Sequence, residues 1–200
     1  EFFNSKKLII ATGGNISGYK LAEALGHKLV KPVPSLFTFT CRDAQLNDCK
    51  GVTMKNLDLN LIVNKKIFKN KGDLLITHWG FSGPGILKLS SLAARELNFA
   101  KYNFKLIIRW TNLEYLDLYR KINLLRKNNG KSNLFTVRPL PQITKRLWIF
   151  LLNKIGINIH KTWSEILAFE RDQVIKLLLS DEYHISGKGP IYELSANPIL

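Results

Sequence analysis

Apolar residues recur along this chain with two different periods, and the period changes near Trp110. Before that residue, the alternation at Leu57, Leu59 and Leu61 is typical of a strand that buries one of its faces. After it, apolar residues repeat every three or four positions, which is typical of amphipathic helices. The pattern therefore predicts a strand-rich part followed by a helical part.

Short apolar runs separated by turn residues make up the strand-rich part. Residues 65–69 and 74–77 are expected to form a hairpin around the turn Asn70-Lys71-Gly72. Short strands with one helix among them favour a small antiparallel barrel. Further strands are expected at residues 35–40, 51–63 and 104–110.

The helical part is expected to form three or four short helices in a compact cluster. Asn128-Asn129-Gly130 is a stop signal for the first helix, and Gly156 ends the second. A last strand is expected after the helices, at residues 183–186. The helices themselves are expected at residues 113–125, 143–155, 163–167 and 171–179.

A continuous apolar run near the start, residues 6–11, is typical of a strand buried in a parallel sheet. Thr12-Gly13-Gly14 ends the run, and Ser17 is expected to cap a short helix. Strand, glycine turn and helix N-terminus together form an edge that suits a phosphate or a flavin. The alternative is an ordinary strand-to-helix connection, because glycine-rich motifs match by chance often.

The stretch from Gly72 to Leu89 carries the strongest candidate chemistry. It predicts a strand that ends at Thr77 and His78, a turn with three glycines, and a helix capped by Ser82. Backbone amides at a helix N-terminus bind anions or polarised oxygens, so we expect His78 to stand beside such a site. The alternative is a structural connection in which the histidine is held by a hydrogen bond.

The formal net charge is +15, and the basic residues are concentrated in the middle of the chain. Residues 101–161 contain 13 Lys and Arg but 2 Asp and Glu. A nucleic-acid-binding face looks like this, but a Lys- and Asn-rich composition gives the same excess without any ligand. The positive field would also attract an anionic cofactor or substrate.

Cys41 and Cys49 match no zinc-ligand spacing and no disulfide framework, so we expect reduced thiols and no metal site. No apolar run reaches the ~18 residues that cross a bilayer, and no signal peptide is visible. These features favour a cytoplasmic protein without a membrane partner, and they leave the oligomeric state open. The chain opens without methionine, directly before a strand-like run, so we expect a fragment of a longer protein.

Three stretches of the chain resemble a known family. Gly-Asp-Leu-Leu-Ile-Thr-His-Trp-Gly-Phe-Ser-Gly-Pro at residues 72–84 resembles the central signature of the BaiN-type flavoproteins. These are FAD-dependent oxidoreductases, also labelled the aminoacetone oxidase family. Ala-Thr-Gly-Gly at residues 11–14 resembles the turn of their FAD domain, and residues 19–36 resemble the segment that follows it. The similarity covers nearly the whole chain, and the central run is its specific part.

The resemblance implies an α+β architecture, in which a small antiparallel β-barrel and a helical subdomain are inserted into the edge of a Rossmann-like FAD domain. Residues 1–32 would be the edge of the FAD-binding domain, and residues 33–110 the barrel insert subdomain. Residues 111–182 would be the helical insert subdomain. Residues 183–200 would be a strand that returns to the FAD domain.

The resemblance also implies a function: part of an FAD-dependent, NAD(P)H-linked oxidoreductase, with FAD and NAD(P)H as cofactors. This chain would cover the flavin and shape the pocket of a small-molecule substrate, which disfavours nucleic acid as a partner. His78 would be the catalytic residue. The positions expected to touch FAD are Thr12, Gly13, Gly14, Gly80, Ser82 and Gly83.

The chain departs from the family pattern at both ends. It lacks the Gly-x-Gly-x-x-Gly loop that holds the pyrophosphate, so we expect weak or no FAD affinity for this chain alone. The alternative, from a different class, is a basic barrel-plus-helices module that binds RNA or DNA. The basic segment favours that module, whereas the lack of an RNA-binding aromatic signature or zinc-finger spacing disfavours it.

Overall fold

The structure is a computed structural model that describes residues 4–189, and it divides into two compact units between Val33 and Pro34. The described part of the small unit contains one helix, α1 (Ile16–Ala24). Asn15 caps it, because its side-chain oxygen accepts a hydrogen bond from the Ser17 amide at 3.0 Å. The predicted helix is confirmed, but the predicted cap at Ser17 is wrong, since that residue lies inside the first turn.

No strand forms at residues 6–11 of the small unit, although the apolar run predicted one. Leu8 and Ile9 are instead 62% and 88% exposed. A buried parallel strand needs hydrogen-bonded neighbours and a covering layer on both faces, and residues 4–33 supply neither. Within this unit the run therefore stays irregular and uncovered.

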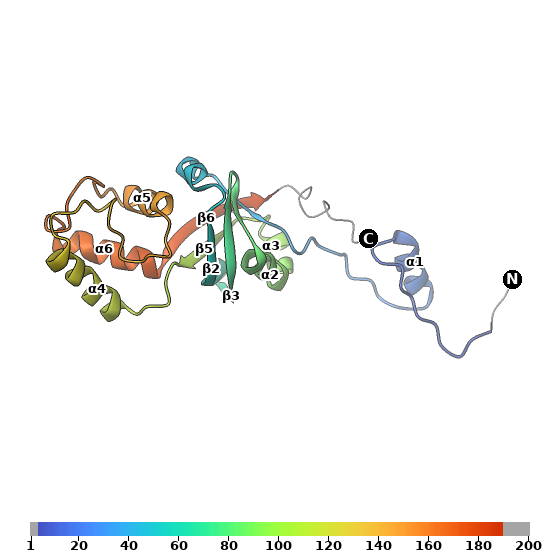
Figure 1. The fold of residues 1–200 in the computed structure, drawn as a ribbon. Coiled ribbons are helices and arrows are strands. Elements are labelled where there is room, and N and C mark those ends of the chain that lie inside the picture. The colour runs from blue at the N-terminus through green and yellow to red at the C-terminus, as the bar shows by residue number, and fades with distance from the viewer. Residues whose placement is uncertain (1–3, 190–200) are drawn as a thin grey trace. The chain divides into compact units, whose positions relative to one another are not determined.

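The large unit is built on a closed antiparallel barrel of six strands, in the order β1-β4-β3-β2-β5-β6 (Figure 1). Leu57, Leu59 and Leu61 of β2 are all buried, as their alternation predicted. The predicted combination of a small antiparallel barrel with helices is confirmed. The strands are β1 (Phe39–Cys41), β2 (Thr53–Val63), β3 (Lys66–Thr77), β4 (Gly80–Ser82), β5 (Phe104–Arg109) and β6 (Asp181–Lys188).

The β2–β3 hairpin turns at Asn64 and Lys65, so the predicted turn at residues 70–72 is wrong. Both turn residues have positive φ (48° and 66°), as the two-residue turn that matches strand twist requires. Gly72 instead lies within β3, where α2 packs on the strand. A Cβ at Gly72 would lie 2.8 Å from the Gly85 Cα, so this glycine marks a close approach rather than a turn.

The helix α2 (Pro84–Leu92) follows β4 and covers part of the barrel, contacting β2, β3 and β4. It begins after Gly83, whose φ is 99°, and Ile86 on its inner face is fully buried. Ser82 belongs to β4, so the predicted cap at Ser82 is wrong. Two shorter helices in this region are α3 (Ala94–Phe99) and the 3-10 helix η1 (Ala44–Cys49).

Three longer helices form a cluster beside the barrel (Figure 1). No helix forms at residues 163–167, where one was expected, because Trp163 anchors a loop there. Its backbone N–H donates to the Ser132 carbonyl and its indole N–H to the Val137 carbonyl, each at 3.0 Å. No helix in the described range is long and apolar enough to cross a membrane. The three helices are α4 (Tyr115–Asn128), α5 (Lys145–Lys154) and α6 (Ala168–Leu179).

The strand after the helices, β6, closes the barrel between β5 and β1. Ile185 pairs with Phe104 of β5 on one side and with Cys41 of β1 on the other. The expectation of a strand returning to an FAD domain therefore does not hold for residues 181–188, and residues 190–200 lie outside the described range. The apolar pattern could not distinguish a strand of the barrel from a strand of an FAD domain, because a strand's neighbours are set by pairing with distant segments.

Candidate functional site

The tight turn between β3 and β4 carries His78, the predicted catalytic residue. Thr77 and Gly80 pair across the hairpin, and His78 and Trp79 form its turn. The His78 side chain is exposed, and its ring stands edge-on to the Trp79 ring with 4.1 Å between centroids. The Trp79 indole N–H donates to Thr38 Oγ1 at 3.3 Å. A fixed aromatic residue therefore supports an imidazole that remains accessible at the barrel edge.

The N-terminus of α2 does not lie directly beside His78, contrary to the prediction. The strand β4 separates the turn from the helix, and Ser82 at its end pairs with Leu75. The helix begins near Asp73 instead: a Cβ at Gly83 would lie 2.8 Å from the Asp73 carbonyl oxygen. The short strand thus moves the positive end of the helix dipole to the other end of the hairpin.

Two glycines that were predicted to touch FAD, Gly80 and Gly83, are required by the barrel backbone. A Cβ at Gly80 would lie 2.3 Å from the Phe39 carbonyl oxygen and 2.7 Å from the Cys41 nitrogen. Gly80 and Gly83 also have φ of 147° and 99°, which favours glycine. The close strand pairing therefore explains why these two positions are glycine. Contact of Gly80, Gly83 and the half-buried Ser82 with a cofactor stays a prediction.

Thr77, next to His78, has a buried hydroxyl without a hydrogen-bond partner among residues 4–189. The residue is 9% exposed. An unsatisfied buried hydroxyl destabilises a fold by about 1–3 kcal/mol, and such groups call for an explanation such as a catalytic role or an ordered water. The unpaired hydroxyl therefore strengthens the case for the hairpin as a functional element.

Thr12, Gly13 and Gly14 form an exposed turn in the small unit, directly before α1. Gly13 has φ of 58°, and a Cβ on Gly13 or Gly14 would meet no atom within 4 Å. The Thr12 side chain occupies the space beside the buried Gly18. Within this unit the backbone of the turn is open to a ligand, and its contact with FAD stays a prediction.

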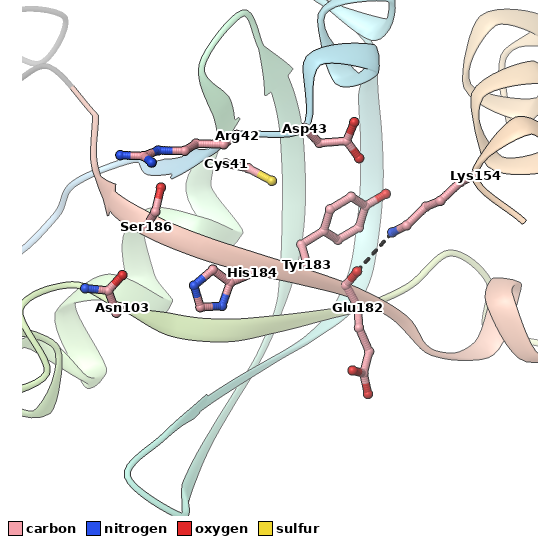
Figure 2. A pocket seen from close by; sticks show the side chains of 9 residues that line it. All are labelled: Cys41, Arg42, Asp43, Asn103, Lys154, Glu182, Tyr183, His184 and Ser186. Atoms are coloured by element: carbon pink, nitrogen blue, oxygen red, sulfur yellow. Dashed lines mark hydrogen bonds between the residues drawn. The ribbon is translucent and has the colours of Figure 1, made fainter.

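A pocket of about 530 Å³ lies where the end of β1 meets β6 and α5 (Figure 2). The β1–β6 register shifts between Thr40 and Cys41, at the edge of the pocket, and such irregularities are common beside active sites. The lining combines a thiol, cations, two acidic residues and hydrogen-bonding groups. It includes Cys41, Arg42, Asp43, Lys154, His184 and Ser186.

The pocket and the His78 turn share one edge of the barrel. The amide of Cys41, which lines the pocket, donates to the carbonyl of Trp79 at 2.8 Å. Trp79 follows His78 directly in the turn. The structure therefore brings the predicted histidine next to a pocket that was not predicted, through one backbone hydrogen bond.

Asp181, at the start of β6, is fully buried beside the pocket. The Trp110 indole N–H and the Tyr183 hydroxyl donate to its Oδ2 at 2.8 and 2.6 Å. Lys154 Nζ contacts its Oδ1 and donates to the Glu182 carbonyl at 2.9 Å. The same ammonium lies 3.5 Å from the centre of the Tyr183 ring, a cation–π contact. These contacts hold Lys154 in place at the pocket wall.

Burial determines the protonation of the groups around the pocket. It raises the pKa of the Cys41 thiol above its ordinary value, so Cys41 is a neutral thiol at neutral pH. Burial and the Asp181 carboxylate raise the pKa of Tyr183 well above its usual range. Burial also raises the pKa of Asp181, and the Lys154 ammonium opposes that shift. The pocket therefore holds a neutral thiol rather than a reactive thiolate.

Sequence reasoning missed this pocket because its members are far apart in the chain. Cys41 was interpreted as an ordinary reduced thiol, Lys154 as one of many basic residues, and Tyr183 as part of a last strand. No spacing motif links the three positions. Only the closure of the barrel by β6, with α5 beside it, brings them together.

Comparison with known proteins gives a family. Residues 33–194 match the family described as HI0933-like protein barrel and H2TH domain. Over 164 residues the chain is 28% identical to a protein of Haemophilus influenzae named ribosomal RNA dihydrouridine synthase, a match that covers 72% of this chain. The chain spans 36% of that relative's length. Because the family match includes the whole barrel and the helical cluster, this chain belongs to the HI0933-like protein barrel and H2TH domain family, a flavoprotein-related family.

Proposed function

We propose that this chain is the barrel and helical part of a flavin-dependent reductase that acts on a base of ribosomal RNA. Membership of a flavoprotein-related family supports the flavin. The observation that carries the RNA substrate is the 28% identical relative, which is named ribosomal RNA dihydrouridine synthase. The net charge of +15 supports it too, because RNA phosphates bind Lys and Arg. RNA thus takes the place of the small-molecule substrate that the resemblance implied.

Formation of dihydrouridine adds one hydride and one proton across a carbon–carbon double bond of uracil. A bound flavin would supply the hydride, with NAD(P)H as the source of electrons in this proposal. The protein then has to hold the base and deliver a proton. His78 at the exposed hairpin turn is our candidate for the proton donor, and the neutral Cys41 thiol is the nearest alternative in the adjoining pocket.

The residues of this chain differ in how well they fit a flavin. The turn at Thr12, Gly13 and Gly14 fits, because its glycines are unobstructed and its amides precede a helix. Gly80 and Gly83 offer no such cradle, because the chain's own backbone fills the space beside them. We therefore assign cofactor contact within this chain to the turn, and to Gly80, Ser82 and Gly83 the role of shaping the hairpin that carries His78.

The RNA half of the proposal is tested in cells that lack the gene. Ribosomal RNA from these cells is digested to nucleosides, and dihydrouridine is measured by mass spectrometry. We expect dihydrouridine to fall relative to wild type and to return when the intact gene is restored. An unchanged dihydrouridine content would exclude this substrate.

The flavin half is tested separately on the purified full-length protein, by its visible absorbance spectrum. A flavin spectrum is expected, and a colourless, correctly folded protein would exclude the cofactor.

The second candidate function, a basic module that binds RNA or DNA without chemistry, is favoured by the excess of basic residues. It predicts RNA binding together with no flavin and no change in dihydrouridine.

A further inference from the structure

Two loops of the helical cluster are joined into one surface, which we call the loop platform (residues 130–138, residues 158–164 and Lys145). The Leu134 amide donates to the Lys161 carbonyl at 2.8 Å, and Asn133 and Thr162 form a β-bridge. Beneath the platform, the buried Trp148 donates from its indole to the Leu134 carbonyl at 2.7 Å. Backbone bonds above and a tryptophan below therefore make this irregular surface rigid.

An aromatic and cationic cluster lies on the loop platform. The Lys145 ammonium is 4.9 Å from the centre of the Phe135 ring. The His160 ring stands edge-on to the same ring, with 5.6 Å between centroids. His160 and Lys145 are exposed and Phe135 is half-buried, so ring surface and positive charge meet at one place that solvent reaches.

Positive charge predominates around this cluster, although Glu165, next to the loop platform, accepts hydrogen bonds from the Thr162 amide and hydroxyl at 2.7 and 2.9 Å. Residues 118–161 contain ten Lys and Arg and no Asp or Glu. On the loop platform, Lys131, Arg138 and Lys145 form no ion pair with any residue in the described range. The Nε of Arg138 is also buried without a hydrogen-bond partner there. The other basic groups of this segment that are ion-paired are Arg120, Lys154 and Lys161, with Asp117, Asp181 and Glu170.

We propose that the loop platform binds an unpaired stretch of the RNA substrate. A base would stack on the Phe135 ring, with the His160 ring edge-on beside it, and the flanking phosphates would contact Lys131, Arg138 and Lys145. Single-stranded nucleic acid is bound in this way, by aromatic faces for the bases and cations for the backbone. This inference rests on the proposed function, in which the substrate is RNA. The rings of Phe135 and His160, beside cations that form no ion pair in the described range, favour a nucleic acid with accessible bases over a partner that is only negatively charged.

The test measures binding of the full-length protein to a fluorescent, uridine-rich RNA of about 12 nucleotides, a usual size for single-strand sites. Fluorescence anisotropy gives Kd at several salt concentrations. Phe135→Leu keeps an apolar side chain and removes the ring, and Lys145→Gln removes one charge. Lys176→Gln is the matched control, because Lys176 is an exposed lysine of α6 outside the loop platform.

We expect Phe135→Leu to raise Kd at least fivefold, the lower end of the effect of losing one stacked base. Lys145→Gln should weaken binding and reduce the slope of log K against log salt by about 1. Lys176→Gln should bind like wild type. Thermal unfolding of each variant confirms that it is folded, and Phe135→Tyr, which keeps the ring, provides the rescue.

Several results would contradict RNA binding by the loop platform. If Phe135→Leu and Lys145→Gln bind RNA as tightly as Lys176→Gln, the RNA lies elsewhere on the protein while the proposed function stands. If polyglutamate competes as well as RNA does, the surface attracts any polyanion, including acidic proteins. If wild-type protein binds no RNA at low salt, both the platform and the RNA substrate are excluded, whereas the flavin spectrum still decides the cofactor.

Discussion

The ammonium of Lys154 in α5 contacts the carboxylate of Asp181 at the start of β6, and this contact joins the helical cluster to the barrel. The Asp181 side chain is 0% exposed and that of Lys154 is 23% exposed. Trp110 and Tyr183 donate to the same carboxylate. A buried charge of this kind is tolerated only while its partners are present, so removing its counterion should strongly destabilise the fold.

Replacing Lys154 with Met should lower the free energy of unfolding by about 3–5 kcal/mol, because it leaves the Asp181 charge buried without its counterion. Urea unfolding measures the change. The control is Lys105→Met, which removes a salt bridge to Glu182 whose side chains are 48% and 53% exposed. That exposed pair should contribute at most about 1 kcal/mol. Equal effects of the two variants would contradict a stabilising role for the buried pair.

Glu170 should make stability depend on pH. Burial acts to raise the pKa of its carboxyl, but the Leu167 amide and the Lys161 ammonium outweigh burial and hold it below the ordinary value of 4.5. A lowered folded pKa means that the ionised group stabilises the fold above the unfolded pKa, and that this is lost as pH falls through the folded pKa.

Glu170→Gln should therefore destabilise the protein by about 1–2 kcal/mol at pH near 7. The difference from wild type should shrink as the pH falls below about 4. Urea unfolding at both pH values measures it, with the exposed Glu182→Gln as control. A difference that stays constant with pH would show that the charge of Glu170 is not the stabilising feature.

Two glycine substitutions separate packing from cofactor binding. Gly80→Ala should destabilise the fold by more than about 2 kcal/mol, because its Cβ would collide with the β1 backbone. Gly14→Ala should change stability by less than about 0.5 kcal/mol, because nothing lies within 4 Å of its Cβ. Thermal unfolding and the ratio of flavin to protein are measured on both. Normal flavin content in Gly14→Ala would count against the assigned cofactor turn.

His78→Gln tests the candidate proton donor. The side chain is exposed, so the variant should fold and hold flavin like wild type. Turnover of the full-length enzyme should fall roughly 100-fold, the usual scale of acid–base help. Cys41→Ser is the comparison, since Cys41 lines the adjoining pocket. Unchanged turnover in His78→Gln together with reduced turnover in Cys41→Ser would identify the Cys41 thiol as the proton donor instead.

Local patterns were sufficient for most of the elements. Alternation at Leu57, Leu59 and Leu61 identified β2, and helical spacing identified α4 and α5, because these periods reflect which side of each element is buried. The run at residues 72–89 predicted the strand that ends at Thr77 and the helix that follows, but not the short strand β4 between them. The predicted turn of the β2–β3 hairpin was wrong. Gly72 suggested a turn, but a glycine is needed there because α2 packs closely on the strand.

Tertiary structure decided how these elements meet. The sequence contains Cys41, Lys154 and Asp181 but no signal that joins them, since closure of the barrel by β6 depends on pairing with two distant strands. The short strand β4 likewise separates the helix N-terminus from His78. The three glycines between residues 80 and 85 predicted a turn there and gave no sign of a strand. Periodicity reports the environment of each element on its own, whereas a pocket depends on long-range backbone hydrogen bonds and side-chain packing between elements.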